Sequence, residues 1–369
     1  MAEMDMGLAP KKKKHGKKKK KQQNLFMSIV TGLIPWKGDS TTEIFRKIVF
    51  LVALIVLVAA VVIIAGNMLR YEELDANAGV DENGNQTATN AYIVELKNQT
   101  PTQQQIEQLP AGSINEEYAS LYAANNDFIG WVNIPATNVD YPVMQSDDND
   151  YYLHRDFDGN YDFAGTIFTD YEGKFGPDEM PNNTILYGHN MLYKYQFAAL
   201  SNYSRDIEFL KTSPVIEFDT LYQKNKYKIF AVFKINTAAE HGELFAYNEY
   251  VYFKNQSEFY NYIMEVMDRS LYETGVDIEY GDELLTLSTC DASTGLDDLR
   301  LVVVARRVRE NESPEVDTSL IKRKKSVKYF DAYYDVYGNT WSGRTWDVSL
   351  VKGMEEYLRD NGLEDEPKE

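Results

Sequence analysis

Residues 284–306 read LLTLSTCDASTGLDDLRLVVVAR, which is two β-prone runs on either side of a polar, turn-like segment. The first run, 284–290, alternates with a period of two and therefore places Ser288 and Cys290 on one face of a strand. The second run is rich in valine and carries Arg300 near its start. Because the intervening segment is short, we expect the two strands to pair as a hairpin that brings Arg300 near Cys290.

Similar short runs fill the chain upstream of this hairpin. From Phe128 onward, apolar stretches are separated by turn residues, and about eight strands fit within about 180 residues. Such spacing predicts a mainly β domain, built either as a closed barrel or as a sandwich. One helix interrupts the strands at 257–271, where apolar side chains follow a helical period. The expected strands are 131–134, 139–143, 165–168, 184–187, 214–218, 227–234, 284–290 and 299–306.

Charge divides the chain into a basic head and an acidic body. Residues 1–70 contain 13 Lys or Arg and 4 Asp or Glu, which leaves a net charge of −28 on the remainder of the chain. An acidic body is repelled by a phosphate backbone, so this distribution argues against a nucleic-acid-binding protein. It instead suggests that the head and the body lie in different compartments.

The head contains a segment that is long enough to cross a membrane. Ile48 to Ala65 gives 18 consecutive residues without charge, proline or glycine, which meets the length that a spanning helix requires. Arg46 and Lys47 precede it, so the positive-inside rule predicts a cytoplasmic N-terminus and an extracellular body. Lys11 to Lys21 holds nine lysines, which we interpret as a topology signal that also contacts anionic lipid. We expect an uncleaved signal anchor, and cleavage near Ala65-Gly66-Asn67 is the alternative.

Polar segments flank the predicted β domain. Residues 67–112 are rich in Asn, Gln and Thr and suggest an extracytoplasmic stalk. Ser113 and Glu116 then resemble a capping box that opens a short helix. After Val308 the chain is polar, then basic, then rich in Tyr and Trp. These aromatic residues either cover one face of the core, form a hairpin around Gly338-Asn339 or make a binding surface.

The chain has one cysteine and four histidines. A lone cysteine is more often a buried small hydrophobe than a nucleophile, and nucleophilic activity requires a nearby base or cation. His15 lies in the lysine tract, and His154 and His241 lie in polar surroundings typical of a surface. His189 differs because it ends an apolar run where the backbone turns at a glycine. With Arg300 as an oxyanion donor, Cys290 and His189 form a chemically complete set for acyl transfer.

Two motifs resemble those of the sortase family. Thr286-Leu287-Ser288-Thr289-Cys290, followed by Arg300 on a valine-rich strand, is similar to the sortase catalytic signature, and Tyr187-Gly188-His189-Asn190-Met191 is similar to the histidine motif. The run 148–153 and the helix at 257–271 resemble class B sortases. The resemblance covers residues 116–308. It implies an eight-stranded closed β-barrel with an N-terminal helix and an inserted helix before the cysteine strand.

The resemblance also implies a reaction and its partners. Cys290 would attack the Thr carbonyl of a sorting signal similar to Leu-Pro-x-Thr-Gly or Asn-Pro-x-Thr, His189 would transfer protons, and Arg300 would stabilise the oxyanion. The acyl group would pass to a cell-wall amine or a pilin lysine, without a metal or other cofactor. The substrate groove is expected to use two groups of residues, four in its wall and three in the loop before the 257–271 helix. They are Asn149, Leu153, Tyr187 and Ser288 in the wall, and Leu244, Phe245 and Tyr247 in the loop.

The expected organisation has five parts. They are a basic cytoplasmic tail (1–47), a transmembrane signal anchor (48–66), a stalk (67–112), a sortase-like catalytic domain (113–309) and a C-terminal extension (310–369). The lysine tract and the extension depart from the usual family pattern. Two alternatives remain open, a secreted cysteine protease in which water resolves the thioester, and a membrane-tethered binding domain in which Cys290 is structural.

Overall fold

The structure is a computed structural model that describes residues 32–76, 78–80, 86–191, 195–291 and 298–363. The chain forms two compact units, residues 1–72 and 73–369. The lysine tract, which we predict to be a topology signal, lies outside the described residues.

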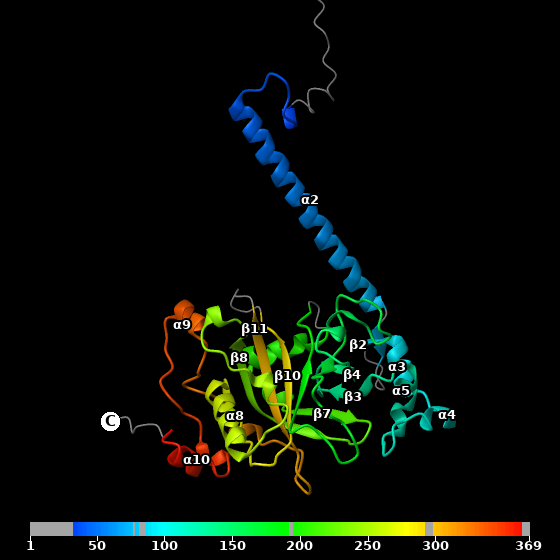
Figure 1. The fold of residues 1–369 in the computed structure, drawn as a ribbon, viewed down its shortest axis with the longest axis vertical. Helices are drawn as coiled ribbons and strands as arrows, with labels where there is room; N and C mark the ends of the chain where they lie inside the picture. The colour runs from blue at the N-terminus through cyan, green and yellow to red at the C-terminus, as the bar shows by residue number, and fades with distance from the viewer. Residues whose placement is uncertain (1–31, 77, 81–85, 192–194, 292–297, 364–369) are drawn as a thin grey trace, which may run out of the picture. The chain divides into compact units, whose positions relative to one another are not determined.

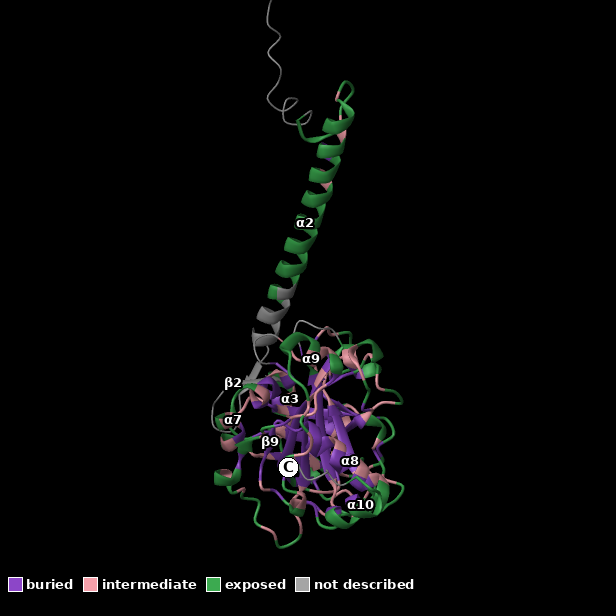
Figure 2. Cartoon of the chain, turned by 90° about the vertical axis from the view of Figure 1, so that its left-hand side faces the viewer, coloured by how far each residue is buried: buried purple, intermediate pink, exposed green. Residues whose placement is uncertain are grey.

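Among its described residues, the first unit is largely one long apolar helix, α2 (Thr41–Ala76), whose last four residues belong to the second unit. Within it, Thr41–Gly66 is long and apolar enough to cross a membrane, and no residue of its most apolar window is buried within the protein (Figure 2). An apolar helix without protein around it is expected to lie in lipid. The helix is therefore consistent with the predicted anchor at 48–66.

The second unit is built around a closed barrel with the strand order β10-β11-β8-β7-β3-β4-β5-β6 (Figure 1). Most neighbours are antiparallel, but β6 pairs with β10, and β4 with β5, in parallel. Each barrel strand overlaps one of the eight expected runs, β5 by one residue alone, and the closed barrel, not the sandwich, is confirmed. The strands are β3 (Phe128–Asn133), β4 (Asp140–Met144), β5 (Phe168–Thr169), β6 (Asn183–Tyr187), β7 (Val215–Thr220), β8 (Lys226–Asn236), β10 (Leu284–Cys290) and β11 (Leu299–Arg307).

Helices and two small sheets complete the second unit. The sheets pair β1 (Ala78–Val80) with β2 (Gln86–Asn90) and β9 (Tyr272–Glu273) with β12 (Lys322–Arg323). The α-helices are α3 (Ala91–Asn98), α4 (Gln103–Ile106), α5 (Ala119–Ala124), α6 (Ser201–Arg205), α7 (Ile207–Thr212), α8 (Gln256–Arg269), α9 (Asp331–Tyr337) and α10 (Met354–Asp360). The 3-10 helices include η1 (Glu116–Tyr118), η2 (Tyr151–His154), η4 (Phe197–Leu200), η5 (Ala239–His241), η6 (Tyr247–Glu249), η7 (Thr318–Leu320) and η8 (Val348–Leu350). Helix α8 is the helix that the spacing of apolar residues over 257–271 predicts.

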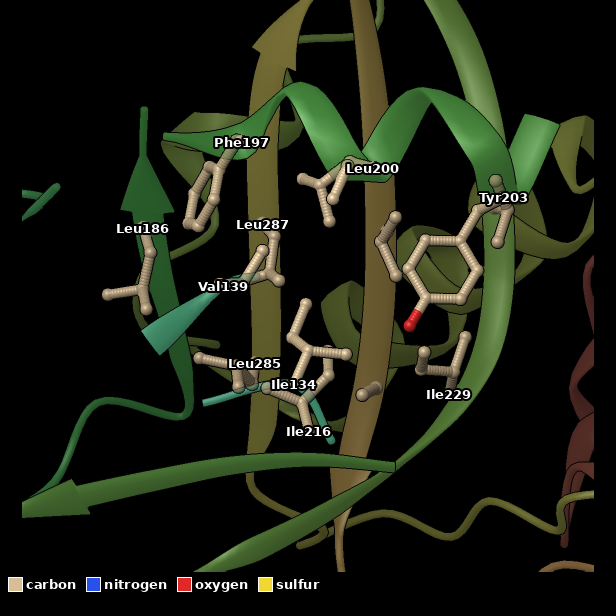
Figure 3. Close-up of a cluster of buried hydrophobic side chains, with 14 of the residues drawn as sticks. Ile134, Val139, Leu186, Phe197, Leu200, Tyr203, Ile216, Ile229, Leu285 and Leu287 are labelled. Carbon is tan, nitrogen blue, oxygen red and sulfur yellow. The ribbon is translucent and has the colours of Figure 1, made fainter. Parts of the chain in front are cut away.

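Alternation along β10 separates two hydrophobic clusters. Leu285 and Leu287 point into the barrel, where they pack with side chains from β6, β7 and η4 (Figure 3). Leu284 belongs instead to an outer cluster that lies between the barrel and α8. Because side chains alternate along a strand, Ser288 and Cys290 share the outer face with Leu284. The site predicted around Cys290 therefore lies outside the barrel, beside the region covered by α8.

The helix expected after Ser113 forms, but the predicted capping box was wrong. The Ser113 hydroxyl donates to the carbonyl of Pro110 at 2.8 Å, within a turn, and does not cap a helix. The chain instead forms η1 and then α5, which begins at Ala119. A complete capping box is found earlier, where Thr102 and Gln105 cap α4.

Part of the predicted stalk contributes to the folded unit. Helix α3 packs Ile93 and Leu96 against a third apolar cluster that includes Trp131. Lys97 of the same helix lies 3.9 Å from the centre of the Trp131 ring and 3.3 Å from the Asp140 carboxylate. The polar composition of 67–112 hides this short amphipathic helix, so residues from α3 onward are not a free spacer.

The C-terminal extension covers the outer cluster. Trp346, Val351 and Met354 pack with residues of α8, which confirms for Trp346 the interpretation that the aromatic tail covers one face of the core. The alternative hairpin at Gly338-Asn339 does not form. Gly338, with φ +69°, ends α9 in the left-handed conformation that favours glycine at this position.

The extension begins at a buried charge network. The side chain of Arg306, at the end of β11, is 1 % exposed and contacts Asp277 at 2.7 Å and Glu312 at 2.6 Å. The hydrogen bond from Arg306, with help from Lys228, lowers the pKa of Glu312. A lowered carboxyl pKa stabilises the fold above the unfolded pKa, near 4.3, and this stabilisation is lost as pH falls through the native pKa.

We expect Arg306→Met to lower the free energy of unfolding by about 1.5–3 kcal/mol at neutral pH, because it removes the hydrogen bonds that the buried guanidinium makes to the Asp277 and Glu312 carboxylates. Its neighbour Arg307, which is 35 % exposed and pairs with Glu283 at 2.8 Å, provides the matched control. Arg307→Met should cost less than about 1 kcal/mol. Urea unfolding of the detergent-solubilised chain measures both, and equal losses would contradict the assigned role of Arg306.

Candidate active site

Cys290 and Arg300 lie directly opposite each other. Cys290 is the last residue of β10, and its antiparallel Cα partner on β11 is Arg300. The predicted hairpin is therefore confirmed. Cys290 is exposed, so it is not the buried small hydrophobe that a lone cysteine most often is. Paired residues on neighbouring strands point to the same face, which brings the thiol and the guanidinium to one side of the barrel.

His189 lies on the other side of Cys290. Strand β6 runs parallel to β10 with Tyr187 opposite Ser288, and the Gly188 N–H donates to the Ser288 carbonyl at 3.2 Å. Strand β6 ends at Tyr187, and His189 follows two residues later in a segment whose Asn190 side chain donates to the Cys290 carbonyl at 2.8 Å. Cys290 on β10, Arg300 on β11 and His189 just beyond the end of β6 thus form a row at this end of the barrel.

Gly188 allows this arrangement because the backbone approaches its neighbours closely. A Cβ atom at position 188 would lie 2.3 Å from Ile167 Cδ1 and 2.8 Å from the Phe197 ring. A larger residue would therefore push the His189 segment away from the barrel end. Close packing therefore requires the glycine that precedes His189 in the sequence.

The backbone and side chains around His189 hold it in place. Its Nε2 atom is 2.8 Å from the Leu153 carbonyl oxygen. A carbonyl only accepts, so Nε2 carries the hydrogen, and Nδ1 is the atom that gains or loses a proton. The His189 carbonyl accepts from the Phe197 N–H at 2.9 Å. Next in the chain, Asn190 donates its side-chain N–H to the Cys290 carbonyl at 2.8 Å, which ties the histidine loop to the end of the cysteine strand.

Burial lowers the pKa of His189, and the charges of His154 and Arg300 lower it further, whereas the hydrogen bond to Leu153 acts in the opposite direction. The His154 ring stacks on the His189 ring with centroids 5.7 Å apart. His154 is exposed, as its polar sequence surroundings suggest. Its proximity to His189 had no signal in the sequence, because it depends on how η2 packs against the end of β6.

We expect the His189 ring to titrate with a midpoint below 6.5, the ordinary value. Because the unfolded chain then binds more protons than the native chain, stability should fall as pH decreases from 6.5 towards the native pKa of His189. NMR titration of the four imidazole rings, assigned with His189→Gln, measures the midpoint. A midpoint at or above 6.5 would contradict the burial argument.

Four of the expected groove residues are linked by hydrogen bonds and strand pairing. The buried Ser288 hydroxyl and the Tyr247 hydroxyl are 2.6 Å apart. Across the β6–β10 pair from Ser288, the Tyr187 hydroxyl donates to Asp170 at 2.8 Å, and Asn149 donates to the same carboxylate at 2.9 Å. Asp170, which sequence reasoning missed, thus orients two of the expected wall residues.

The remaining expected groove residues have different surroundings. Leu153 contributes its backbone carbonyl to His189. Leu244 is 47 % exposed. Phe245 is buried in the outer cluster, where the Arg269 guanidinium lies 4.9 Å from its ring centre. Phe245 therefore supports the loop from beneath, whereas Tyr247 contacts Ser288 directly.

This arrangement contains the groups that acyl transfer requires. An exposed thiol lies between a half-buried imidazole and a guanidinium, and a wall of hydroxyl and amide groups adjoins them. Thiolate attack, proton transfer and oxyanion stabilisation are the three roles that these groups can perform.

Comparison with known proteins gives the family. Residues 132–308 match the model of the sortase domain. Sortase B of Listeria monocytogenes is 34 % identical over 197 residues, which are 53 % of this chain and 76 % of that protein. The chain belongs to the sortase family. It is therefore a sortase-type cysteine transpeptidase, and its similarity is to sortase B.

Other sortase B proteins give similar values. Sortase B of Staphylococcus aureus is 29 % identical over 198 residues, 53 % of this chain and 76 % of that protein. The solved S. aureus sortase B-substrate complex is 28 % identical, covers 56 % of this chain and 93 % of its own, and has a TM-score of 0.48. The structure of Clostridium perfringens sortase B is 30 % identical, covers 51 % of this chain and 98 % of its own, and has a TM-score of 0.46. The matched sortase domain contains His189, Cys290 and Arg300 and ends before the C-terminal extension.

Proposed function

We propose that this sortase cleaves the C-terminal sorting signal of surface proteins after a threonine and transfers the acyl group to a cell-wall or pilin amine. The observation that carries the proposal is the row formed by Arg300 on β11, Cys290 on β10 and His189 just beyond the end of the adjacent β6. Each residue is supplied by a different strand or strand end, so barrel pairing fixes their spacing before substrate binds.

In the first half-reaction, the Cys290 thiolate attacks the carbonyl carbon of the threonine. Electrons move to the carbonyl oxygen, and the Arg300 guanidinium stabilises the resulting oxyanion. The oxyanion then collapses, the C–N bond breaks, and protonated His189 gives its Nδ1 proton to the departing amine. The products are an acyl thioester on Cys290 and a neutral imidazole.

In the second half-reaction, the neutral imidazole takes a proton from the acceptor amine as the amine attacks the thioester carbon. The C–S bond breaks, a new amide bond forms and the Cys290 thiolate returns. The lowered pKa of His189 favours this step, because it keeps the neutral form available near neutral pH.

The groove residues suggest an extended peptide as the substrate. Asn149, Tyr187, Ser288 and Tyr247 supply side-chain donors and acceptors next to the cysteine strand. Such groups can bind the backbone and polar side chains of a signal similar to Asn-Pro-x-Thr or Leu-Pro-x-Thr-Gly. The α2 helix and the positive charges before it favour a single-pass protein with its catalytic domain outside the cell, where surface proteins and wall precursors are found.

The test uses the detergent-solubilised full chain and fluorogenic peptides that carry each signal variant, with and without triglycine or a lysine peptide. A product joined to the amine, identified by mass spectrometry, is the expected result. A free-acid product in the presence of excess amine would favour the cysteine protease, since water resolves the thioester in that reaction. Lack of cleavage of every peptide would overturn the proposed substrate class.

A further inference from the structure

The C-terminal extension lies beyond the matched sortase domain, yet it packs on the face of the barrel that carries Cys290. Trp346, Met354 and Leu358 share the outer cluster with Phe245 and Tyr247 of the loop before α8. One hydrophobic cluster therefore contains both the extension and the segment that we expect to read the sorting signal.

Positive side chains of the extension bind the C-terminal end of α8. Lys324 donates to the carbonyls of Met267 and Asp268, the latter at 3.0 Å. Lys328 donates to the Glu265 carboxylate at 3.1 Å, and Arg344 to Asp268 at 3.2 Å. Cations stabilise a helix C-terminus, where carbonyl groups lack partners within the helix. The extension therefore fixes the end of α8 at several points.

The extension also contacts the loop between β8 and α8 directly. Helix α9 packs on η5 in this loop (Figure 1). Gly242 follows η5 with φ +120°, and a Cβ atom there would lie 2.7 Å from the Asp331 backbone nitrogen at the start of α9. The Gly242 carbonyl accepts from Asn236 at the end of β8, at 3.1 Å. The loop is thus held between the barrel and α9.

A continuous set of contacts runs from Lys328 to the active site. Glu265 binds Lys328 and also Arg269, one turn further along α8. Arg269 is buried and places its guanidinium 4.9 Å from the Phe245 ring centre. Two residues after Phe245, Tyr247 contacts the Ser288 hydroxyl at 2.6 Å. Ser288 precedes Cys290 by two residues on the same face of β10.

We propose that the C-terminal extension is a positioning element for the signal-reading loop, with Lys328 and the contact between α9 and Gly242 as its points of action. By fixing Glu265, Arg269 and Phe245, the extension holds Tyr247 against Ser288 in the arrangement that binds peptide. This role rests on the proposed function. In it, the extension affects the affinity for the sorting signal and not the rate of the chemical step.

The test compares Lys328→Ala and Lys328→Arg with Lys325→Ala, an exposed lysine of the same segment, in the detergent-solubilised full chain. Lys328→Ala should raise the KM for the sorting peptide about tenfold with kcat within about twofold, a coupling of ordinary size for residues linked through packing. Lys328→Arg should restore KM because it keeps the charge near Glu265, and Lys325→Ala should leave KM unchanged.

Hydrogen exchange of residues 238–247 provides a readout that does not depend on turnover. Lys328→Ala should increase exchange in this loop while exchange in β10 and β11 stays the same. Gly242→Ala should act similarly, because its Cβ would displace α9. A wild-type chain that cleaves no peptide would count against the proposed function alone, and loop exchange would still decide this inference. Unchanged KM and unchanged loop exchange in Lys328→Ala, or an equal effect of Lys325→Ala, would overturn it.

Discussion

Cys290→Ala should reduce turnover of the sorting peptide by at least about 10⁴-fold, because no other group in the row can form the acyl intermediate. The thioester should also disappear from the mass spectrum of the chain mixed with peptide and no amine. Since Cys290 is exposed at a strand end, its removal should leave the unfolding curve nearly unchanged.

Cys290→Ser gives the matched control for size and polarity. Its hydroxyl is a far weaker nucleophile than a thiolate at neutral pH, so this variant should bind peptide as the wild type does and yet fail to turn it over. Residual turnover above about one part in a hundred in Cys290→Ala would show that a different nucleophile carries the reaction.

His189→Ala should lower kcat/KM by about 10²–10⁴-fold, the range for loss of general acid–base catalysis. Both half-reactions need proton transfer at Nδ1, so thioester formation and amine capture should slow together. Rapid-quench measurement of each half-reaction tests this expectation.

His154→Ala is the control for His189→Ala because its ring stacks on the same imidazole but lies outside the row of three strands. We expect its kcat/KM to stay within about fivefold of the wild type, since it affects proton transfer only through the charge near His189. Equal losses in the two variants would show that the two histidines share the proton-transfer role.

The strands and their hairpin could be predicted because their signals are local. Each of the eight barrel strands overlaps a short apolar run with turn residues at its ends, and the period along β10 places Ser288 and Cys290 on the same face. Helix α8 was equally clear from its spacing. In these segments the local pattern and the tertiary packing favour the same structure, so each strand could be placed without knowledge of its partner.

Features that depend on distant contacts had to come from the structure. No pattern within β6 or β10 indicates that the two strands pair in parallel, which is the pairing that brings His189 to Cys290. The orientation of Tyr187 by Asp170 and the stacking of His154 likewise depend on loops that meet only in the folded domain. The prediction of a Ser113 capping box was wrong because of a local contact. The Ser113 hydroxyl donates to the Pro110 carbonyl within a turn and therefore does not cap the helix.

The parallel pairing of β6 with β10 also has a consequence during synthesis and folding. Leu284 pairs with Asn183, so about a hundred residues must be synthesised before the histidine segment can reach the cysteine strand, and pairing over such a long range is slow. A chain whose barrel has not yet closed therefore holds its thiol apart from its imidazole. The three residues of the row come together only when the barrel closes, so an incomplete or misfolded copy lacks the arrangement that acyl transfer requires.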